Sequence, residues 1–140
     1  MSTLWQQLHF FTAAYMTGVI WFVQRVEYPL LSHAQGADPA ASHREYTRRM
    51  GPVVGPMMLA EMGLQLYWIA NERTALSLAT GFLLALIWIS TFALQVPAHE
   101  KLCQGYDAEI HRRLVRGNWI RTLSWTTRAG LLLIHFFYFD

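Results

Sequence analysis

The sequence predicts an all-α fold, a four-transmembrane-helix bundle with short amphipathic loop helices. The 140-residue chain is 54% hydrophobic and only 14% charged, whereas a typical soluble domain is about 25% charged. Four apolar stretches each reach about 20 residues, the length that crosses a bilayer core. No alternating strand pattern appears, and a lipid environment requires every backbone group to be paired within the protein. Residues 1–140 are therefore expected to form a single integral membrane domain.

The predicted spans cover residues 4–24, 50–71, 74–98 and 118–139. The first and third contain no charged residue, the second contains one carboxylate, and the fourth contains two arginines. The N-terminus has neither a basic region nor a small-residue cleavage site, so we expect the first span to be retained rather than removed as a signal peptide.

The connections between the spans differ in character. Asp38 followed by a proline is a good N-cap and first turn, which predicts a short helix over 39–49. A very short connection at Glu72 makes the second and third spans a tight hairpin. Asp107 is the expected cap of an amphipathic helix over 107–116 at the membrane surface.

The distribution of basic residues predicts the orientation, because cytoplasmic loops carry an excess of lysine and arginine. The first loop holds Arg25, Arg44, Arg48 and Arg49, the third holds Lys101, Arg112, Arg113 and Arg116, and the opposite side holds Arg73 alone. We expect a multi-pass protein of the bacterial inner (plasma) membrane, with loops one and three cytoplasmic and both termini outside.

Composition also limits the partners. The net charge is only +2, and no basic run is interleaved with aromatic residues, so no nucleic acid partner is expected. The single cysteine, Cys103, excludes an intrachain disulfide and a multi-cysteine metal site. The expected partners are membrane lipids and a small apolar substrate. A homo-oligomer stays open, because Gly18, Gly55, Gly63 and Gly81 leave room for close helix contacts.

Charged residues inside a span are costly and usually face the protein interior. With a rise of about 1.5 Å per residue, Glu61 and Arg128 both lie about 15 Å from the cytoplasmic edge. We therefore predict that they pair, directly or through water. The pair is a candidate for chemistry, or a structural ion pair that fixes the helix register.

Polar residues recur on one face of several spans, which predicts a polar cavity open toward the cytoplasm. In the fourth span the stripe comprises Asn118, Arg121, Trp125, Arg128 and His135, and in and after the third span it comprises Trp88, Thr91, Gln95 and His99. The second span adds Glu61 and Gln65, and the first span and its cytoplasmic end add His9, Gln24 and Glu27. Asn118, Trp88, Trp125 and Gln95 are the candidate substrate-binding residues. The alternatives are that Asn118 caps the fourth helix and that Arg121 extends to the lipid headgroups.

The remaining aromatic and histidine side chains have simpler interpretations. An interfacial belt is the expected role of Trp5, Trp68, Trp119 and Tyr138. His9 and His135 are expected to be hydrogen-bonded packing residues, and His33, His43 and His111 are expected to be exposed in loops.

A metal or haem site is a further hypothesis. Glu27, His43 and His99 come from three segments on the cytoplasmic side, and a carboxylate with two imidazoles suits zinc, iron or manganese. Haem would require an axial histidine inside the bundle, for which His9 is the candidate. The absence of any cofactor is the third alternative.

Several short motifs stand out along the chain: Gln95-Val96-Pro97-Ala98-His99-Glu100-Lys101-Leu102, then Asn118-Trp119-Ile120-Arg121-Thr122, with His9 early in the first helix and Tyr28-Pro29 closing it. Together they resemble the anthrone oxygenase-like family of small four-helix membrane proteins. An asparagine is usual near position 99 in the fungal members, whereas this chain has His99 and looks closer to uncharacterised bacterial relatives. A looser architectural likeness is to the J-type protoporphyrinogen oxidases, which bind haem.

The resemblance implies an oxidoreductase that oxidises an apolar aromatic or quinone-like substrate without an obvious cofactor. The candidate catalytic residues are then Glu61 or His99 as the general base and Arg121 or Arg128 as the cation that stabilises a developing oxyanion. Trp88 and Trp125 are expected to stack on a planar ring. The alternative is a non-catalytic binding, transport or accessory membrane protein.

Overall fold

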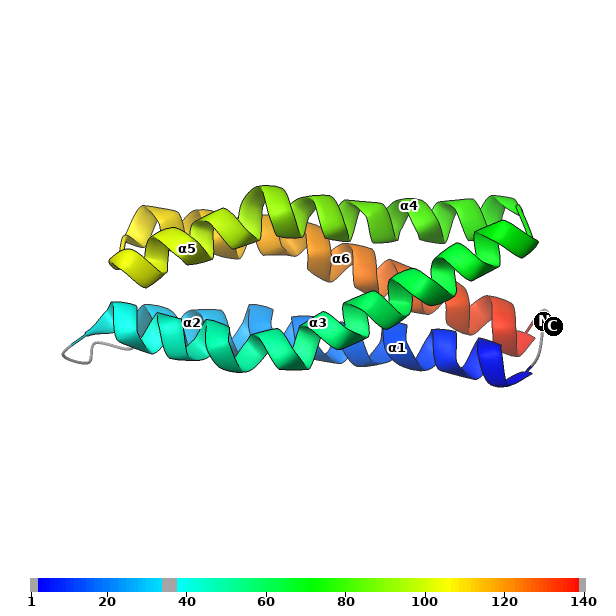
Figure 1. The fold of residues 1–140 in the computed structure, drawn as a ribbon, viewed down its shortest axis with the longest axis horizontal. Helices are drawn as coiled ribbons and strands as arrows, with labels where there is room; N and C mark the ends of the chain where they lie inside the picture. The colour runs from blue at the N-terminus through cyan, green and yellow to red at the C-terminus, as the bar shows by residue number, and fades with distance from the viewer. Residues whose placement is uncertain (1–2, 34–37, 139–140) are drawn as a thin grey trace.

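The computed structural model describes residues 3–33 and 38–138, and within these ranges the chain is helical with no strand. Four long helical rods run alternately up and down (Figure 1). The elements are α1 (Thr3–Phe22), η1 (Val23–Glu27), α2 (Tyr28–His33), α3 (Pro39–Asn71), α4 (Ala75–Ser90), η2 (Thr91–Gln95), α5 (Val96–Gln104) and α6 (Ala108–Tyr138). The segments α1–η1–α2 and α4–η2–α5 each form one continuous rod. The start of α1, the end of α6 and the α3–α4 turn share one end of the bundle, and α2 and α5 lie at the other.

The helix starts follow from capping side chains. Asp38 accepts a 3.0 Å hydrogen bond from the backbone N–H of Ala41 at the start of α3. Asp107 accepts from the backbone N–H groups of the first turn of α6 at 2.8 and 2.9 Å. Thr74 and Ser77 form a reciprocal capping box at the start of α4. Both predicted aspartate caps and the short hairpin connection are therefore confirmed.

The separate loop helices are a wrong prediction. Residues 39–49 are the first three turns of α3, and residues 108–116 are the first turns of α6, with no break before the apolar segments. Gly117 does not interrupt α6, because its backbone is helical and no described glycine has positive φ. It allows close packing instead, since a Cβ at this position would lie 3.3 Å from Nε2 of Gln95. The predicted fourth span ends at 139, which lies outside the described residues.

Two π-helical segments widen the rods, and each lies just before a proline. Proline lacks an N–H, and its ring clashes with the carbonyl four residues earlier. For Pro29 and Pro97 that carbonyl lies inside η1 and η2, respectively. A π turn displaces this carbonyl without breaking the helix. Tyr28 and Gln95 stand at the ends of these wide turns.

The bundle places polar groups inside and apolar groups outside. Buried polar side chains come from all four rods and include His9, Gln24, Glu61, Gln65, Gln95, Asn118, Arg121 and Arg128. Large apolar side chains face outward on each rod, among them Phe11, Leu66, Phe82 and Leu123, which are between 55% and 64% exposed. Two helical segments, Pro39–Asn71 and Ala75–Gln104, are long and apolar enough to cross a membrane.

Candidate functional site

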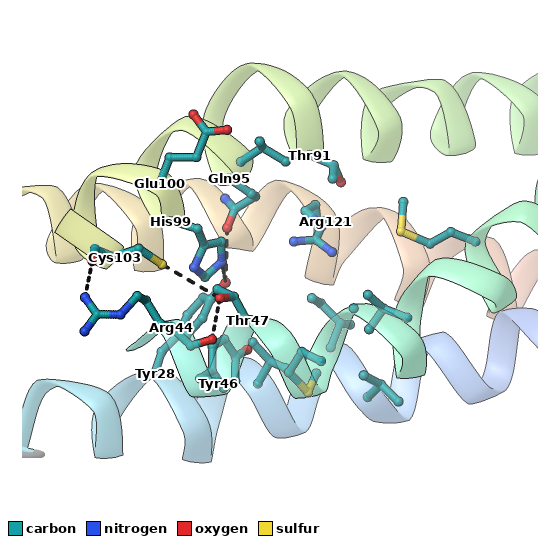
Figure 2. Close-up of a pocket in the computed structure, with 18 of the residues that line it drawn as sticks. Tyr28, Arg44, Tyr46, Thr47, Thr91, Gln95, His99, Glu100, Cys103 and Arg121 are labelled. Atoms are coloured by element: carbon teal, nitrogen blue, oxygen red, sulfur yellow. Dashed lines mark hydrogen bonds between the residues drawn. The ribbon is translucent and has the colours of Figure 1, made fainter. Parts of the chain in front are cut away.

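A cavity of about 650 Å³ lies between the rods in the half of the bundle that contains η1 and η2. Most of the lining surface is apolar, and aliphatic and methionine side chains such as Met16, Ile20, Val54 and Met58 from α1 and α3 contribute to it. Polar side chains gather in one part of the wall, as Figure 2 shows; they include Tyr28, Tyr46, Gln95, His99 and Arg121. The volume suits a small organic ligand, because typical ligand pockets measure about 300–1,000 Å³. The predicted polar cavity is therefore corrected to an apolar cavity with a polar region.

A chain of side-chain contacts runs through the polar region. The hydroxyl of Tyr28 lies 3.2 Å from Oε1 of Gln95 and 3.3 Å from Nε2 of His99. Nδ1 of His99 lies 2.8 Å from Nε2 of His43. Burial raises the pKa of Tyr28 to about 12, so its hydroxyl is neutral at neutral pH. The site thus joins an imidazole pair to a phenol and an amide.

Arg121 lines the same cavity and is 7% exposed. It donates to Oδ1 of Asn118 at 3.3 Å, and its guanidinium carbon lies 5.2 Å from the ring centroid of Trp125. Its Nε is buried and has no hydrogen-bond partner. Asn118 is fully buried in the middle of α6 and donates to Oε1 of Gln24 at 2.8 Å. The alternatives in which Asn118 caps a helix and Arg121 reaches the headgroups are therefore wrong.

Glu61 and Arg128 form the predicted ion pair, and both side chains are fully buried. Trp125 donates to the second oxygen of Glu61 at 2.8 Å. Arg128 also donates to Oε1 of Gln65 at 3.2 Å and lies 2.7 Å from Nε2 of His9. None of these side chains lines the cavity, so Glu61 and Arg128 are not placed to act on a ligand bound there.

The three-ligand metal hypothesis is wrong for the described residues. No group of three or more histidine, cysteine, aspartate or glutamate side chains within residues 3–33 and 38–138 is arranged to hold a metal ion. His43 and His99 bond to each other, and Glu27 does not complete a site with them. His9, the candidate haem ligand, has its Nε2 atom 2.7 Å from Arg128 and its ring packed edge-on against Trp5.

Several aromatic and histidine positions also differ from expectation. Trp125 is fully buried behind Arg121, and Trp88 stacks on Phe92, so neither lines the cavity. Trp68 is 1% exposed and stacks on His135, which removes it from an interfacial belt. The side chain of Tyr138 lies outside the described part of the chain.

Two histidines expected in loops are buried. His43 is 3% and His111 is 5% exposed, whereas His33 is exposed as expected. Nε2 of His111 lies 3.0 Å from the carbonyl oxygen of Tyr28, which only accepts, so this nitrogen carries the proton. Burial lowers the pKa of His111 below its usual value.

The sequence reasoning missed the contributions of Tyr28 and Tyr46 to the site. Tyr28 was noted only as part of a motif that closes the first helix, and Tyr46 lies within the stretch expected to be a separate loop helix. For Tyr28 the sequence did contain a signal, because Pro29 follows it directly and a proline distorts the helical turn that precedes it. Comparison with family models, curated proteins and solved structures found no match.

Proposed function

We propose that the chain is an integral membrane protein whose four rods all cross the bilayer. Two helical segments meet the length and hydropathy of a span. Apolar side chains face outward on every rod, and charged side chains are buried between the rods. Both features support a membrane-spanning position for the two remaining rods, α1–η1–α2 and α6, as well. The 33-residue α3 is about 50 Å long, and a bilayer core is about 30 Å thick, so one end of it extends beyond the lipid tails.

We propose that the end with α2 and α5 faces the cytoplasm, because the segments there carry most of the lysine and arginine residues. Cys103, the single cysteine, lies near this end of α5 and is partly exposed. A membrane-impermeant maleimide is expected to label it in inverted inner-membrane vesicles and not in intact spheroplasts. Labelling confined to spheroplasts would reverse the orientation, and a protein recovered from the soluble fraction would exclude the membrane assignment.

We further propose that the cavity is the active site of an oxygenase-like oxidoreductase that acts on a small apolar aromatic or quinone-like substrate. The observation that carries this proposal is the presence of an imidazole, His99, and a buried guanidinium, Arg121, in the wall of one apolar cavity. The residues behind the family resemblance support it. Gln95, His99 and Arg121 all line the cavity, and Asn118 donates and accepts beside them.

The chemistry assigns one step to each polar group. His99 removes a proton from a CH₂ group that is conjugated with a carbonyl group, and Arg121 stabilises the resulting enolate oxygen in a site of low polarity. Molecular oxygen, which is apolar, reaches the site from the lipid and oxidises the carbanion. In the complete reaction a CH₂ group and O₂ become a C=O group and water. His43 receives or returns the proton through its 2.8 Å contact with His99.

A second candidate, a non-catalytic binding protein, is favoured by one observation. Both ring nitrogens of His99 already have neighbours, His43 at 2.8 Å and Tyr28 at 3.3 Å. A base must turn toward the substrate to act, whereas a binding residue has no such requirement.

Oxygen uptake separates the two candidates. Purified protein in lipid nanodiscs is supplied with anthrone and with a panel of apolar aromatic ketones that carry a CH₂ group conjugated with the carbonyl. Turnover is expected, and His99→Ala and Arg121→Gln are each expected to lower kcat by about 100-fold, the size typical of losing a base or an oxyanion partner. Arg49→Gln, which removes a charge from the exposed Glu45–Arg49 pair, is the matched control and should retain activity. Full turnover in both site variants would contradict the mechanism, and ligand binding without turnover would favour the binding protein.

A further inference from the structure

The two buried arginines of α6 differ in their partners. Arg128 is matched by the Glu61 carboxylate and by acceptors on Gln65 and His9. Arg121, seven residues earlier on the same face, has a single hydrogen-bond acceptor among the described residues, the amide oxygen of Asn118 at 3.3 Å. None of the ion pairs among the described residues includes Arg121.

The neighbours of Arg121 do not supply the missing negative charge. Tyr28, Gln95 and Asn118 are neutral groups. Glu100 also lines the cavity, but its side chain is exposed at the rim and makes no ion pair there. A buried cation without a counter-ion is strongly unfavourable, because burial removes its hydration and nothing replaces it. This arrangement is expected when the counter-ion belongs to a ligand.

The shape of the cavity indicates the remainder of that ligand. Arg121 extends from α6 into the space between η2 and α3 (Figure 2), so an anionic group bound to it lies beside Gln95 and His99. The other walls offer aliphatic and methionine side chains such as Met16 and Met58, which accommodate an apolar body of varied shape. Arg44 at the rim is already matched by Asp38, so the buried charge that calls for an anion is Arg121.

We propose that the ligand of this cavity is an apolar molecule with one anionic oxygen group, a carboxylate or a phenolate, that pairs with the Arg121 guanidinium. This inference rests on the proposed function, because it identifies the substrate class of the same site. It adds that the ligand is already an anion when it binds, whereas the proposed reaction requires a negative charge only during the chemical step.

Binding of two isosteric probes tests the proposal without any turnover. Protein in nanodiscs of neutral phosphatidylcholine is titrated with 2-naphthoate and with 2-naphthamide, and empty nanodiscs provide the blank. The wild-type protein is expected to bind the carboxylate at least about tenfold more tightly, the size of one charge-assisted hydrogen bond. Arg121→Gln is expected to abolish this preference while retaining amide binding, and Arg121→Lys to restore part of it. Arg49→Gln should keep the full preference, because it lies outside the cavity.

The outcomes distinguish this proposal from the enzymatic one. A preference for the carboxylate that survives in a folded Arg121→Gln protein would overturn the assignment, as would equal binding of both probes or binding of neither. If Arg121→Gln does not fold, the Arg121→Lys protein decides: an unchanged preference for naphthoate over naphthamide would contradict direct pairing, since lysine lacks the planar fork of arginine. A clear preference in a protein that never consumes oxygen would support the ligand class and exclude the oxidation.

Discussion

Replacing Glu61 with glutamine should destabilise the bundle more than any single exposed substitution. Glutamine preserves the size of the side chain and still accepts the hydrogen bond that Trp125 donates at 2.8 Å. It removes the negative charge, and Arg128 then remains fully buried with only neutral acceptors, Gln65 and His9. The substitution therefore isolates the contribution of charge from that of packing.

The magnitude follows from the complete burial of the pair. Leaving one partner of a buried ion pair without the other costs about 3–5 kcal/mol, because the remaining charge has lost both water and its counter-ion. Replacing both partners with apolar residues of similar size is close to neutral in other proteins. We therefore expect Glu61→Gln to lower the free energy of unfolding by about 3–5 kcal/mol. The double variant Glu61→Met with Arg128→Met should recover part of that loss, because no charge is left buried but Trp125, Gln65 and His9 each lose a hydrogen-bond partner.

Equilibrium unfolding in mixed micelles with increasing dodecyl sulfate, followed by tryptophan fluorescence, measures the difference. Glu45→Gln is the matched control, because it removes the same charge from a pair at the surface of α3, and it should leave the unfolding midpoint unchanged. A Glu61→Gln protein that unfolds at the wild-type midpoint would refute the reasoning, since a fully buried guanidinium must then tolerate the loss of its counter-ion. A double variant less stable than Glu61→Gln would show that the ion pair stabilises the fold by more than the two charges neutralising each other.

Four further predictions concern neighbouring features of the bundle. Asn118→Leu leaves the buried partners of both amide atoms unsatisfied and should cost about 1–3 kcal/mol in the same unfolding assay. Burial lowers the pKa of His111, so the unfolded chain binds a proton at this residue more readily than the folded chain does. The stability that His111 contributes is therefore complete above about pH 6.5 and is lost as the pH falls toward the pKa in the folded state. Unfolding midpoints of the His111→Gln variant should accordingly depend less on pH than those of the wild-type protein. Gly117→Leu should destabilise by about 1–3 kcal/mol through close contact with η2, whereas Gly55→Ala, where a Cβ meets nothing within 4 Å, should stabilise α3 by up to about 1 kcal/mol.

The helical class and the main ion pair were predictable because both depend on regular geometry. Apolar stretches of spanning length indicate helices, and a constant rise per residue places Glu61 and Arg128 at the same depth. The starts of α3 and α6 were equally predictable. At each start a short aspartate side chain, Asp38 or Asp107, accepts hydrogen bonds from the first turn and caps the helix. These inferences need no knowledge of how the rods pack.

The composition of the site was less predictable because it depends on the packing of several rods at once. The stripe on α6 correctly grouped Arg121 with Arg128, but it did not indicate that only Arg121 borders empty space. Periodicity along one helix gives the face on which a residue lies, not the neighbours that fill the space in front of it. For the same reason Trp125 was expected to stack on a ligand and instead donates to Glu61 behind the cavity.

The different environments of Arg121 and Arg128 follow from the positions of the two prolines. At the level of Arg128 the rods are regular α-helices, and Glu61, Gln65 and His9 reach the guanidinium directly. At the level of Arg121 the rods opposite contain the wide turns η1 and η2, which precede Pro29 and Pro97 and face a cavity instead of a packed core. A proline inside a helix is tolerated when neighbouring groups or a local π turn accommodate the freed backbone. Here two such adjustments lie beside one cavity, so the same sequence feature that disturbs the helices also leaves Arg121 without a protein counter-ion and open to a ligand.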